Sequence, residues 1–300
     1  MKTRCSDFRP LRFGAVSTSR PDCRAFTRTD LLALLFATGL LAALGLPALA
    51  TSGRGAASAG CLNNLRRLAQ GWLLFAEDHS GFLPGNVDNG STTGYNWVGG
   101  QAGPSGAQEF NPEILQNPTQ SQLASYLGRE AEPFRCPADL RTGRYQGANV
   151  AFKGLIVPAA RSYSLNGAVG TQADGHNPVD GPWLDGRHSH RANTTWRTFG
   201  RLADIVYLAP AQLHTFVGEA SMSLNDGHFS TSMQTANAMR FVDWPETTHD
   251  FGGGFAFADG RAEIHRWQDP RTVAFATPFG YAPDNPDVAW VQAHTTVRNR

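Results

Sequence analysis

The chain has 300 residues, of which 41% are apolar and 17% charged, and its formal net charge is +1. This composition excludes a disordered chain, and the 32 Gly and 18 Pro indicate a globular protein rich in loops. Without the first 25 residues, which hold six Lys/Arg and two Asp, 20 basic and 23 acidic residues remain, a net charge of −3. No basic stripe is left that would indicate nucleic acid as a partner.

A basic leader and an apolar run open the chain. The leader covers residues 1–25, and the uncharged run Leu31–Ala50 follows shortly after it. Twenty helical residues are about 30 Å long, which is the thickness of the hydrocarbon core of a bilayer. A basic flank stays on the cytoplasmic side. The sequence therefore predicts a single membrane anchor over 31–50, with the rest of the chain facing the periplasm or the cell exterior.

The residues at the junction resemble the start of type IV prepilins and of the pseudopilins of type II secretion. That family has a small residue before the cut, then Phe-Thr-Leu-Ile-Glu and a hydrophobic helix with a Pro near its position 22. The matching residues here are Ala25 before the cut, Phe26, Thr27 and Pro47. The resemblance implies cleavage before Phe26 by a prepilin peptidase, methylation of the new N-terminus, and a role in assembly for the carboxylate of Asp30.

This chain departs from the family at three positions. Arg28 and Thr29 replace the Leu-Ile pair, and Asp30 stands where the family has Glu. A second interpretation uses the same region, because Ala48-Leu49-Ala50 has the small-x-small form of an ordinary signal-peptidase site. Cleavage there would release a soluble protein that begins at Thr51.

A second helical segment follows the apolar run. Thr51–Gly60 contains three Gly and predicts a bend or flexible neck. From Cys61 to Ala76, apolar residues recur every three or four positions, which predicts an amphipathic helix with one buried stripe. His79-Ser80-Gly81 ends it. We therefore expect an N-terminal helix over 26–80, an extracytoplasmic head over 81–267, and a tail over 268–300 with no clear period.

Within the head, the pattern predicts one short helix, three strands and two long loops. The helix is Thr119–Gly128, and the strands are Arg161–Asn166, His214–Glu219 and Met239–Asp243. The loops are 85–106 and 167–193.

A β-hairpin is predicted over Gly252–Trp267. Its arms flank Asp259-Gly260, which we interpret as a two-residue turn. Phe255 and Phe257 then share one face, with Ala262 and Ile264 opposite them on the second arm. His249 precedes the turn by nine residues, which gives a His-x9-Asp-Gly segment over 249–260.

This segment, together with the prepilin-like start, resembles a large bacterial family of prepilin-type proteins with a C-terminal His-x9-Asp-Gly segment. Further matching segments are Cys61–Arg66, Phe134–Asp139, Arg161–Asn166 and Ser223–Phe229. The resemblance implies a pilin-like α+β fold with a hydrophobic N-terminal helix, an antiparallel sheet and long loops. It implies pilin or pseudopilin subunits as partners and no established reaction.

The cysteines indicate one disulfide. Cys5 and Cys23 lie in the leader, which leaves Cys61 and Cys136 outside. In an oxidising compartment this pair predicts a bond that closes a loop of about 75 residues and contributes about 4 kcal/mol. The alternative is two unpaired buried thiols. No Cys-x-x-Cys or other zinc spacing is present.

No catalytic residue and no cofactor is predicted. His249 has no nucleophile in a recognisable elbow and more simply bonds the hairpin backbone or marks a surface contact. His188 and His190 lack a third metal ligand, and Asn225 and Asp226 are weak candidates for calcium. Three tryptophans among loop signals suggest stacking on sugars, namely Trp183, Trp196 and Trp244. The sequence thus predicts a non-enzymatic, membrane-anchored pilin-like subunit; the alternative is a secreted or tethered surface module that binds polysaccharide or protein.

Overall fold

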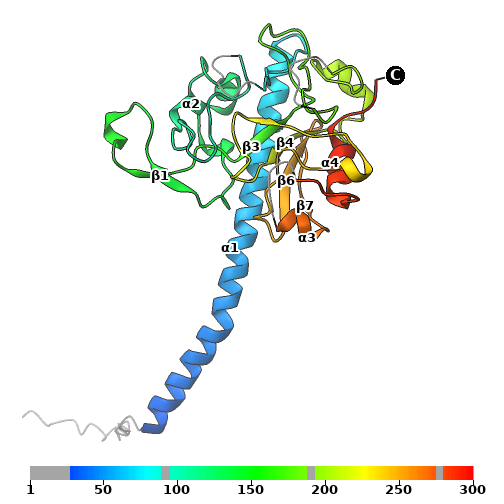
Figure 1. The fold of residues 1–300 in the computed structure, drawn as a ribbon. Helices are drawn as coiled ribbons and strands as arrows, with labels where there is room; N and C mark the ends of the chain where they lie inside the picture. Colours follow the sequence, from blue (N-terminus) through cyan, green and yellow to red (C-terminus); the bar gives the residue numbers. More distant parts are fainter. Residues whose placement is uncertain (1–27, 89–94, 188–192, 275–279, 300) are drawn as a thin grey trace, which may run out of the picture. The chain divides into compact units, whose positions relative to one another are not determined.

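The computed structural model describes residues 28–88, 95–187, 193–274 and 280–299. The fold is mixed α+β, with an antiparallel sheet as predicted (Figure 1). The chain divides into two compact units, Met1–Leu49 and Ala50–Arg300. The second unit, which we call the head, contains both sheets and both hydrophobic cores.

Helix α1 runs without interruption from Arg28 to Asp78. The Gly-containing segment Thr51–Gly60, for which a bend or flexible neck was predicted, is assigned to this helix throughout. The absence of a side chain at Gly60 lets α1 pack closely against Pro137, because a Cβ atom there would lie 2.9 Å from Cγ of Pro137. The helix ends as predicted, with Gly81 at φ +86° and its N–H donating to the carbonyl of Ala76 at 2.7 Å. Within the described residues, no helix has the length and apolar character needed to cross a bilayer.

The main sheet has five strands in the order β5-β3-β4-β6-β7. They are β3 (Tyr163–Asn166), β4 (His214–Gly218), β5 (His228–Phe229), β6 (Gly252–Phe257) and β7 (Ala262–Arg266). All pairs are antiparallel except β3 with β5. A separate two-stranded arm pairs β1 (Thr142–Arg144) with β2 (Ile156–Pro158). The predicted strands at β3 and β4 are confirmed, whereas Met239–Asp243 makes only isolated bridges.

The two faces of the sheet bury different cores. One face packs with the buried stripe of α1, including Leu65 and Trp72. The other carries Phe255 and Phe257 and packs with α4 (Pro286–Thr295), which belongs to the segment predicted as a tail. The remaining helical segments are short: α2 (Glu113–Gln116), α3 (Pro270–Val273), and the 3-10 helices Gln122–Leu127, Glu132–Phe134, Val150–Phe152, Leu202–Tyr207 and Ala236–Ala238.

The predicted hairpin forms, but in a different register. Phe255 pairs with Glu263, and Gly254 pairs with Ile264. The N–H of residue 257 donates to the carbonyl of residue 261, which leaves three residues in the loop, and Gly260 alone in this loop has positive φ. A three-residue loop shifts the pairing by one residue and reverses which side chains share a face. Ile264 therefore packs with the α1 side, and the phenylalanines pack on the opposite face.

Candidate metal centre

Four buried side chains converge inside the head. Their potential ligand atoms all lie within 4.8 Å of one another, and they belong to Cys61, Cys136, Glu246 and His249. The cysteines are fully buried, and Glu246 and His249 are each 4% exposed. The cluster therefore combines two thiols, one carboxylate and one imidazole away from bulk water.

Three segments far apart in the chain supply these groups. Cys61 begins the buried stripe of α1, Cys136 follows the 3-10 helix Glu132–Phe134, and the other two side chains come from the loop before β6. Asn64 is buried and donates from Nδ2 to the carbonyls of Glu132 and Arg135 at 3.2 and 2.9 Å. This side chain thereby fixes the loop that carries Cys136 against the helix that carries Cys61.

The imidazole of His249 contacts three partners. Its Nε2 lies 3.1 Å from Sγ of Cys136 and 3.4 Å from Oε1 of Glu246, while Nδ1 lies 3.1 Å from Oγ of Ser58. The next two residues, Asp250 and Phe251, have φ of 54° and 59°. Left-handed backbone at residues other than Gly costs about 1–3 kcal/mol each and clusters at functional sites. The loop is thus held in a costly conformation that presents His249 to the cluster.

Glu246 lies in a cradle made by glycines. Its Oε1 accepts the N–H of Gly254 at 3.0 Å and lies 3.8 Å from Sγ of Cys61, and its Oε2 accepts the hydroxyl of Thr248 at 3.0 Å. A Cβ atom at Gly218 would lie 2.0 Å from Oε1, and one at Gly254 would lie 2.9 Å from the Cys61 sulfur. The carboxylate can occupy this place because both positions lack a side chain.

Both sulfur atoms accept further hydrogen bonds. The hydroxyl of Tyr163 donates to Sγ of Cys61 at 3.3 Å, and the N–H of Ala138 donates to Sγ of Cys136 at 3.4 Å. The backbone N–H of Cys136 donates to Oγ of Ser162 at 3.1 Å. Such bonds orient the sulfur atoms and favour their ionised form.

The four groups shift one another's proton affinity. The hydrogen bond with Cys136, together with burial, raises the pKa of Cys61, whereas the same bond lowers the pKa of Cys136 to about 7 against the effect of burial. Burial alone would lower the pKa of His249, but its bonds with Cys136 and Glu246 raise that pKa to about 10. With no ligand bound, the cluster favours one thiolate beside an imidazolium.

This arrangement is chemically suited to three events: binding a thiophilic cation, forming a disulfide, or acting as a thiolate–imidazolium nucleophile. The last requires that a substrate reach the sulfur of Cys136, which is 0% exposed. As for the second, the structure has both cysteines as free buried thiols where the sequence predicted a disulfide. Besides their hydrogen bond with each other, the sulfur of Cys136 contacts the imidazole and the sulfur of Cys61 contacts the carboxylate.

Several segments singled out in the sequence meet at this point. Three of these segments supply cluster members: Cys61–Arg66 supplies Cys61, Phe134–Asp139 supplies Cys136, and the His-x9-Asp-Gly segment supplies His249. A fourth, Arg161–Asn166, supplies Ser162 and Tyr163, which form hydrogen bonds with the two cysteines. Sequence reasoning missed Glu246, because a lone Glu three residues before a His has no distinguishing pattern. The Asp259-Gly260 pair of the same segment lies in the hairpin turn and is not a member of the cluster.

The predicted processing residues are only partly described. Ala25 and Phe26 lie outside the described residues, as do His188 and His190. Asp30 lies in the first turn of α1 and is exposed.

The calcium candidates lie at a second buried polar group, in which Asp226 is buried while Asn225 is exposed. The carbonyl of Asn225 accepts a bond of 2.7 Å from the guanidinium of Arg161, and Asp226, 2% exposed, accepts the N–H of His228. Arg161 is fully buried and already supplies a positive charge near Asp226. Glu219 is buried in the same group, where the hydroxyl of Ser164 donates to it.

The tryptophans do not form an exposed platform. Trp244 is 4% exposed and donates to the carbonyl of Thr272 at 2.9 Å. Trp183 and Trp196 are half-buried, and each has an arginine guanidinium, from Arg240 or Arg298, over its ring. Their placement gives no support to stacking on sugars.

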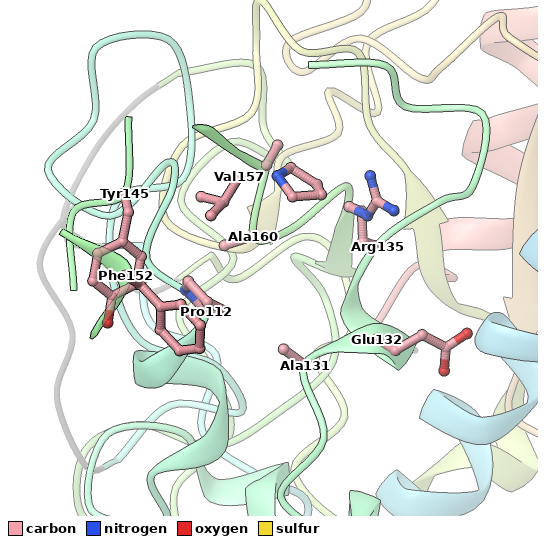
Figure 2. A pocket seen from close by; sticks show the side chains of 10 residues that line it. Pro112, Ala131, Glu132, Arg135, Tyr145, Phe152, Val157 and Ala160 are labelled. Atoms are coloured by element: carbon pink, nitrogen blue, oxygen red, sulfur yellow. The ribbon is translucent and has the colours of Figure 1, made fainter. Parts of the chain in front are cut away.

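A separate apolar hollow lies beside the β1–β2 arm. Its volume is about 260 Å³, and Figure 2 shows the rings of Tyr145 and Phe152 at one end and Arg135 at the other. The two rings meet edge-on with centroids 5.5 Å apart. Pro112 and Val157 complete the apolar wall.

The chain matches no family model, and comparisons with curated proteins and with solved structures find no similar protein. The resemblance to prepilin-type proteins therefore stays a prediction. A proposal about function must rest on that resemblance and on the geometry of the structure.

Proposed function

We propose that this chain is an exported, pilin-like and non-enzymatic subunit, anchored by its N-terminal helix and assembling with related subunits in a type II secretion-like or type IV pilus-like system. The observation that carries the proposal is α1 itself. It is one helix of 51 residues, and its C-terminal turns form the spine of an α+β head. A helix of this kind can serve at once as an assembly element and as part of the core, while the proposed anchoring role rests on the apolar run Leu31–Ala50 of the sequence.

The first described turns of α1 support this role. Large apolar side chains there are 48–75% exposed, and they are Leu31, Leu32, Leu34, Leu35 and Phe36. A contiguous apolar surface of this kind needs a membrane or neighbouring helices around it. Asp30, at the start of the same segment, offers the carboxylate that would pair with a neighbouring subunit.

The N-terminus of the protein from its native host tests the processing step. Intact-mass and N-terminal peptide analysis should find a chain that begins at Phe26 with a methylated amine. A chain that retains the leader, or that begins at Thr51, would contradict prepilin-type processing.

Assembly is tested separately with Asp30. We expect Asp30→Ala to abolish cross-linked subunit ladders in the envelope, Asp30→Glu to retain them, and Glu77→Ala, an exposed acidic control on α1, to leave them unchanged. Ladders from Asp30→Ala equal to those of the wild type would overturn the proposed role of this carboxylate.

A released binding module is the second candidate function, because the compact head begins at Ala50, next to the predicted signal-peptidase site. The apolar hollow beside the arm would be its candidate surface for a polysaccharide or protein ligand (Figure 2). A mature chain found in the medium and starting at Thr51 would favour this function over the first.

A further inference from the structure

We propose that Cys61, Cys136, Glu246 and His249 bind one Zn²⁺ ion in a closed structural site. The inference stands on the geometry of the head and does not depend on whether the chain assembles into a filament. Two thiolates, an imidazole and a carboxylate are all ligands that zinc takes in proteins.

The spacing of the ligand atoms suits a tetrahedral zinc ion. Zinc binds sulfur at about 2.3 Å and nitrogen or oxygen at about 2.0–2.2 Å, so neighbouring ligand atoms in a tetrahedron are roughly 3.3–3.8 Å apart. The corresponding separations are 3.1 Å from Cys136 Sγ to His249 Nε2, 3.4 Å from that nitrogen to Glu246 Oε1, and 3.8 Å from that oxygen to Cys61 Sγ. Shifts of a few tenths of an ångström would bring these three separations to tetrahedral values, and all the ligand atoms lie within 4.8 Å of one another.

The surrounding groups orient each ligand as metal sites require. A zinc-bound histidine uses its second ring nitrogen to hold a hydrogen-bond partner, and here Nδ1 of His249 faces the hydroxyl of Ser58. The second oxygen of Glu246 is held by Thr248, and the sulfurs are held by Tyr163 and by a backbone N–H. One potential ligand atom of each residue remains within 4.8 Å of the other three.

The charge balance favours an ion over a disulfide. A buried carboxylate without compensation is strongly destabilising. Among the described residues, the ion pair recorded for Glu246 is with His249, and both lie beside two ionisable thiols. A disulfide would remove the thiols and leave the carboxylate and imidazole converging on an uncharged bond. Zinc would use all four groups, and its binding would release to solvent the protons that the thiols and the metal-facing nitrogen of the imidazole carry.

The donor set also selects the kind of metal and its role. Thiolates are poor ligands for Ca²⁺ and Mg²⁺, and a tetrahedral site with two sulfurs is typical of zinc. Four protein ligands leave no open position for water or substrate, which is the mark of a structural site. Glu246 and Thr248 also line a hollow of about 510 Å³ together with the exposed Leu140, which offers the ion a route from solvent.

Such an ion would tie α1 to two loops of the head. The linked positions are separated by 75 residues between the cysteines and by 113 between Cys136 and His249. Metal binding would therefore contribute directly to the folding of the head around its helix.

Metal analysis of the full-length chain, purified in detergent without chelators or reductants, tests the proposal. We expect one zinc per chain by elemental mass spectrometry and two thiols that react with a thiol reagent only after unfolding or chelation. Replacing the metal with Co²⁺ should give the visible absorption bands of tetrahedral thiolate coordination. These measurements use the wild-type chain, so they remain decisive if a ligand variant fails to fold.

Variants then assign the ligands. Cys136→Ser and His249→Asn should lose the bound zinc and the cobalt thiolate spectrum of the wild type, while Ser58→Ala should weaken zinc binding roughly 10–100-fold, as expected for a group that orients a ligand. The matched control is His176→Asn, because His176 is an exposed histidine that bonds within its own turn. It should retain one zinc per chain.

Three results would overturn the proposal. They are a Cys61–Cys136 disulfide without zinc in protein from the native envelope, free thiols that take up neither Zn²⁺ nor Co²⁺, or zinc that stays fully bound in both ligand variants.

Discussion

At the first position of β4, the side chain of His214 is fully buried. Its Nε2 lies 3.2 Å from Oγ1 of Thr295, whose hydroxyl already donates to the carbonyl of Val291 at 2.8 Å. The imidazole must therefore donate from Nε2, while Nδ1 has no hydrogen-bond partner within the described residues. Burial, with a smaller contribution from His294 on α4, lowers the pKa of His214 to about 3.

The low pKa of His214 makes the head less stable in acid. The unfolded chain binds a proton at this residue below pH 6.5, the ordinary pKa, whereas the folded chain does so only near pH 3. Stability is therefore intact above pH 6.5 and falls as the pH decreases between these values. At pH 5 the loss from this residue is about 2 kcal/mol.

Urea unfolding of the wild type and of His214→Gln at pH 8 and pH 5 measures this effect. The glutamine keeps a donor for Thr295 and does not titrate, so the variant should lose about 2 kcal/mol less on acidification. The loss of stability must be compared between the wild type and the variant, and not read from the wild type alone. Burial raises the pKa of Glu219 to about 7, so the contribution of that group to stability changes with pH in the opposite direction. Equal losses in both proteins would contradict the assignment.

Gly254 is needed because the core residue Leu65 and the cluster residue Cys61 lie against it. A Cβ atom there would lie 2.7 Å from Cδ1 of Leu65 and 2.9 Å from the sulfur of Cys61. Gly254→Ala should therefore destabilise the head by about 1–3 kcal/mol, as overpacking does, and displace Cys61. The control is Gly55→Ala, a helical position with nothing within 4 Å, which should stabilise by about 0.5–1 kcal/mol. Thermal unfolding of both variants compares them, and equal effects would contradict the close packing.

At the scale of single elements, the loop of the β6–β7 hairpin depends on one backbone conformation. Gly260 has φ of +86°. A Cβ atom added there would lie 3.8 Å from Cδ1 of Leu73, so an alanine side chain fits without a clash. Gly260→Ala should cost about 1–2 kcal/mol through backbone strain alone. Gly260→Asn should cost less, since Asn tolerates this region. Chemical denaturation measures both, and an alanine variant as stable as the wild type would contradict the three-residue loop.

Elements with a strong local signal were predictable. The stripe from Cys61 to Ala76, the stop at Gly81 and strands β3 and β4 follow from periodicity and turn residues. The register of the hairpin was not, because a two-residue and a three-residue loop both suit Asp-Gly and differ by a single shifted pair. The continuity of α1 was missed because three glycines lower helix propensity, whereas Gly60 is required by the contact with Pro137.

The cluster was only half predictable from the sequence. Two cysteines left outside the leader indicated a pair, and His249 stood out through its spacing from the turn. Their meeting depends on long-range packing, which brings positions 61, 136 and 246–249 together across three segments. No local pattern marks Glu246, and the ligand spacing is unlike the short repeats of common zinc sites.

At the scale of the whole molecule, the head contains both hydrophobic cores and the buried cluster of four side chains. Both hydrophobic cores draw on residues from Cys61 onward, and the compact unit that contains them begins at Ala50. The first buried residue of α1 in these cores is also a member of the cluster. The turns of α1 that precede the head add no residue to either core within the described part of the chain.

We therefore expect a chain that begins at Thr51 to fold on its own, with the thermal midpoint and metal content of the full-length protein. A chain that begins at Arg66 is the matched control, because it lacks both Cys61 and Leu65 and so loses a cluster residue and a core residue together. It should show no cooperative transition. Calorimetry of the two chains distinguishes the cases. If the longer chain fails to unfold cooperatively, the segment before Thr51 belongs to the folding unit. If the shorter chain is stable, the head does not need the turns of α1 between Thr51 and Leu65.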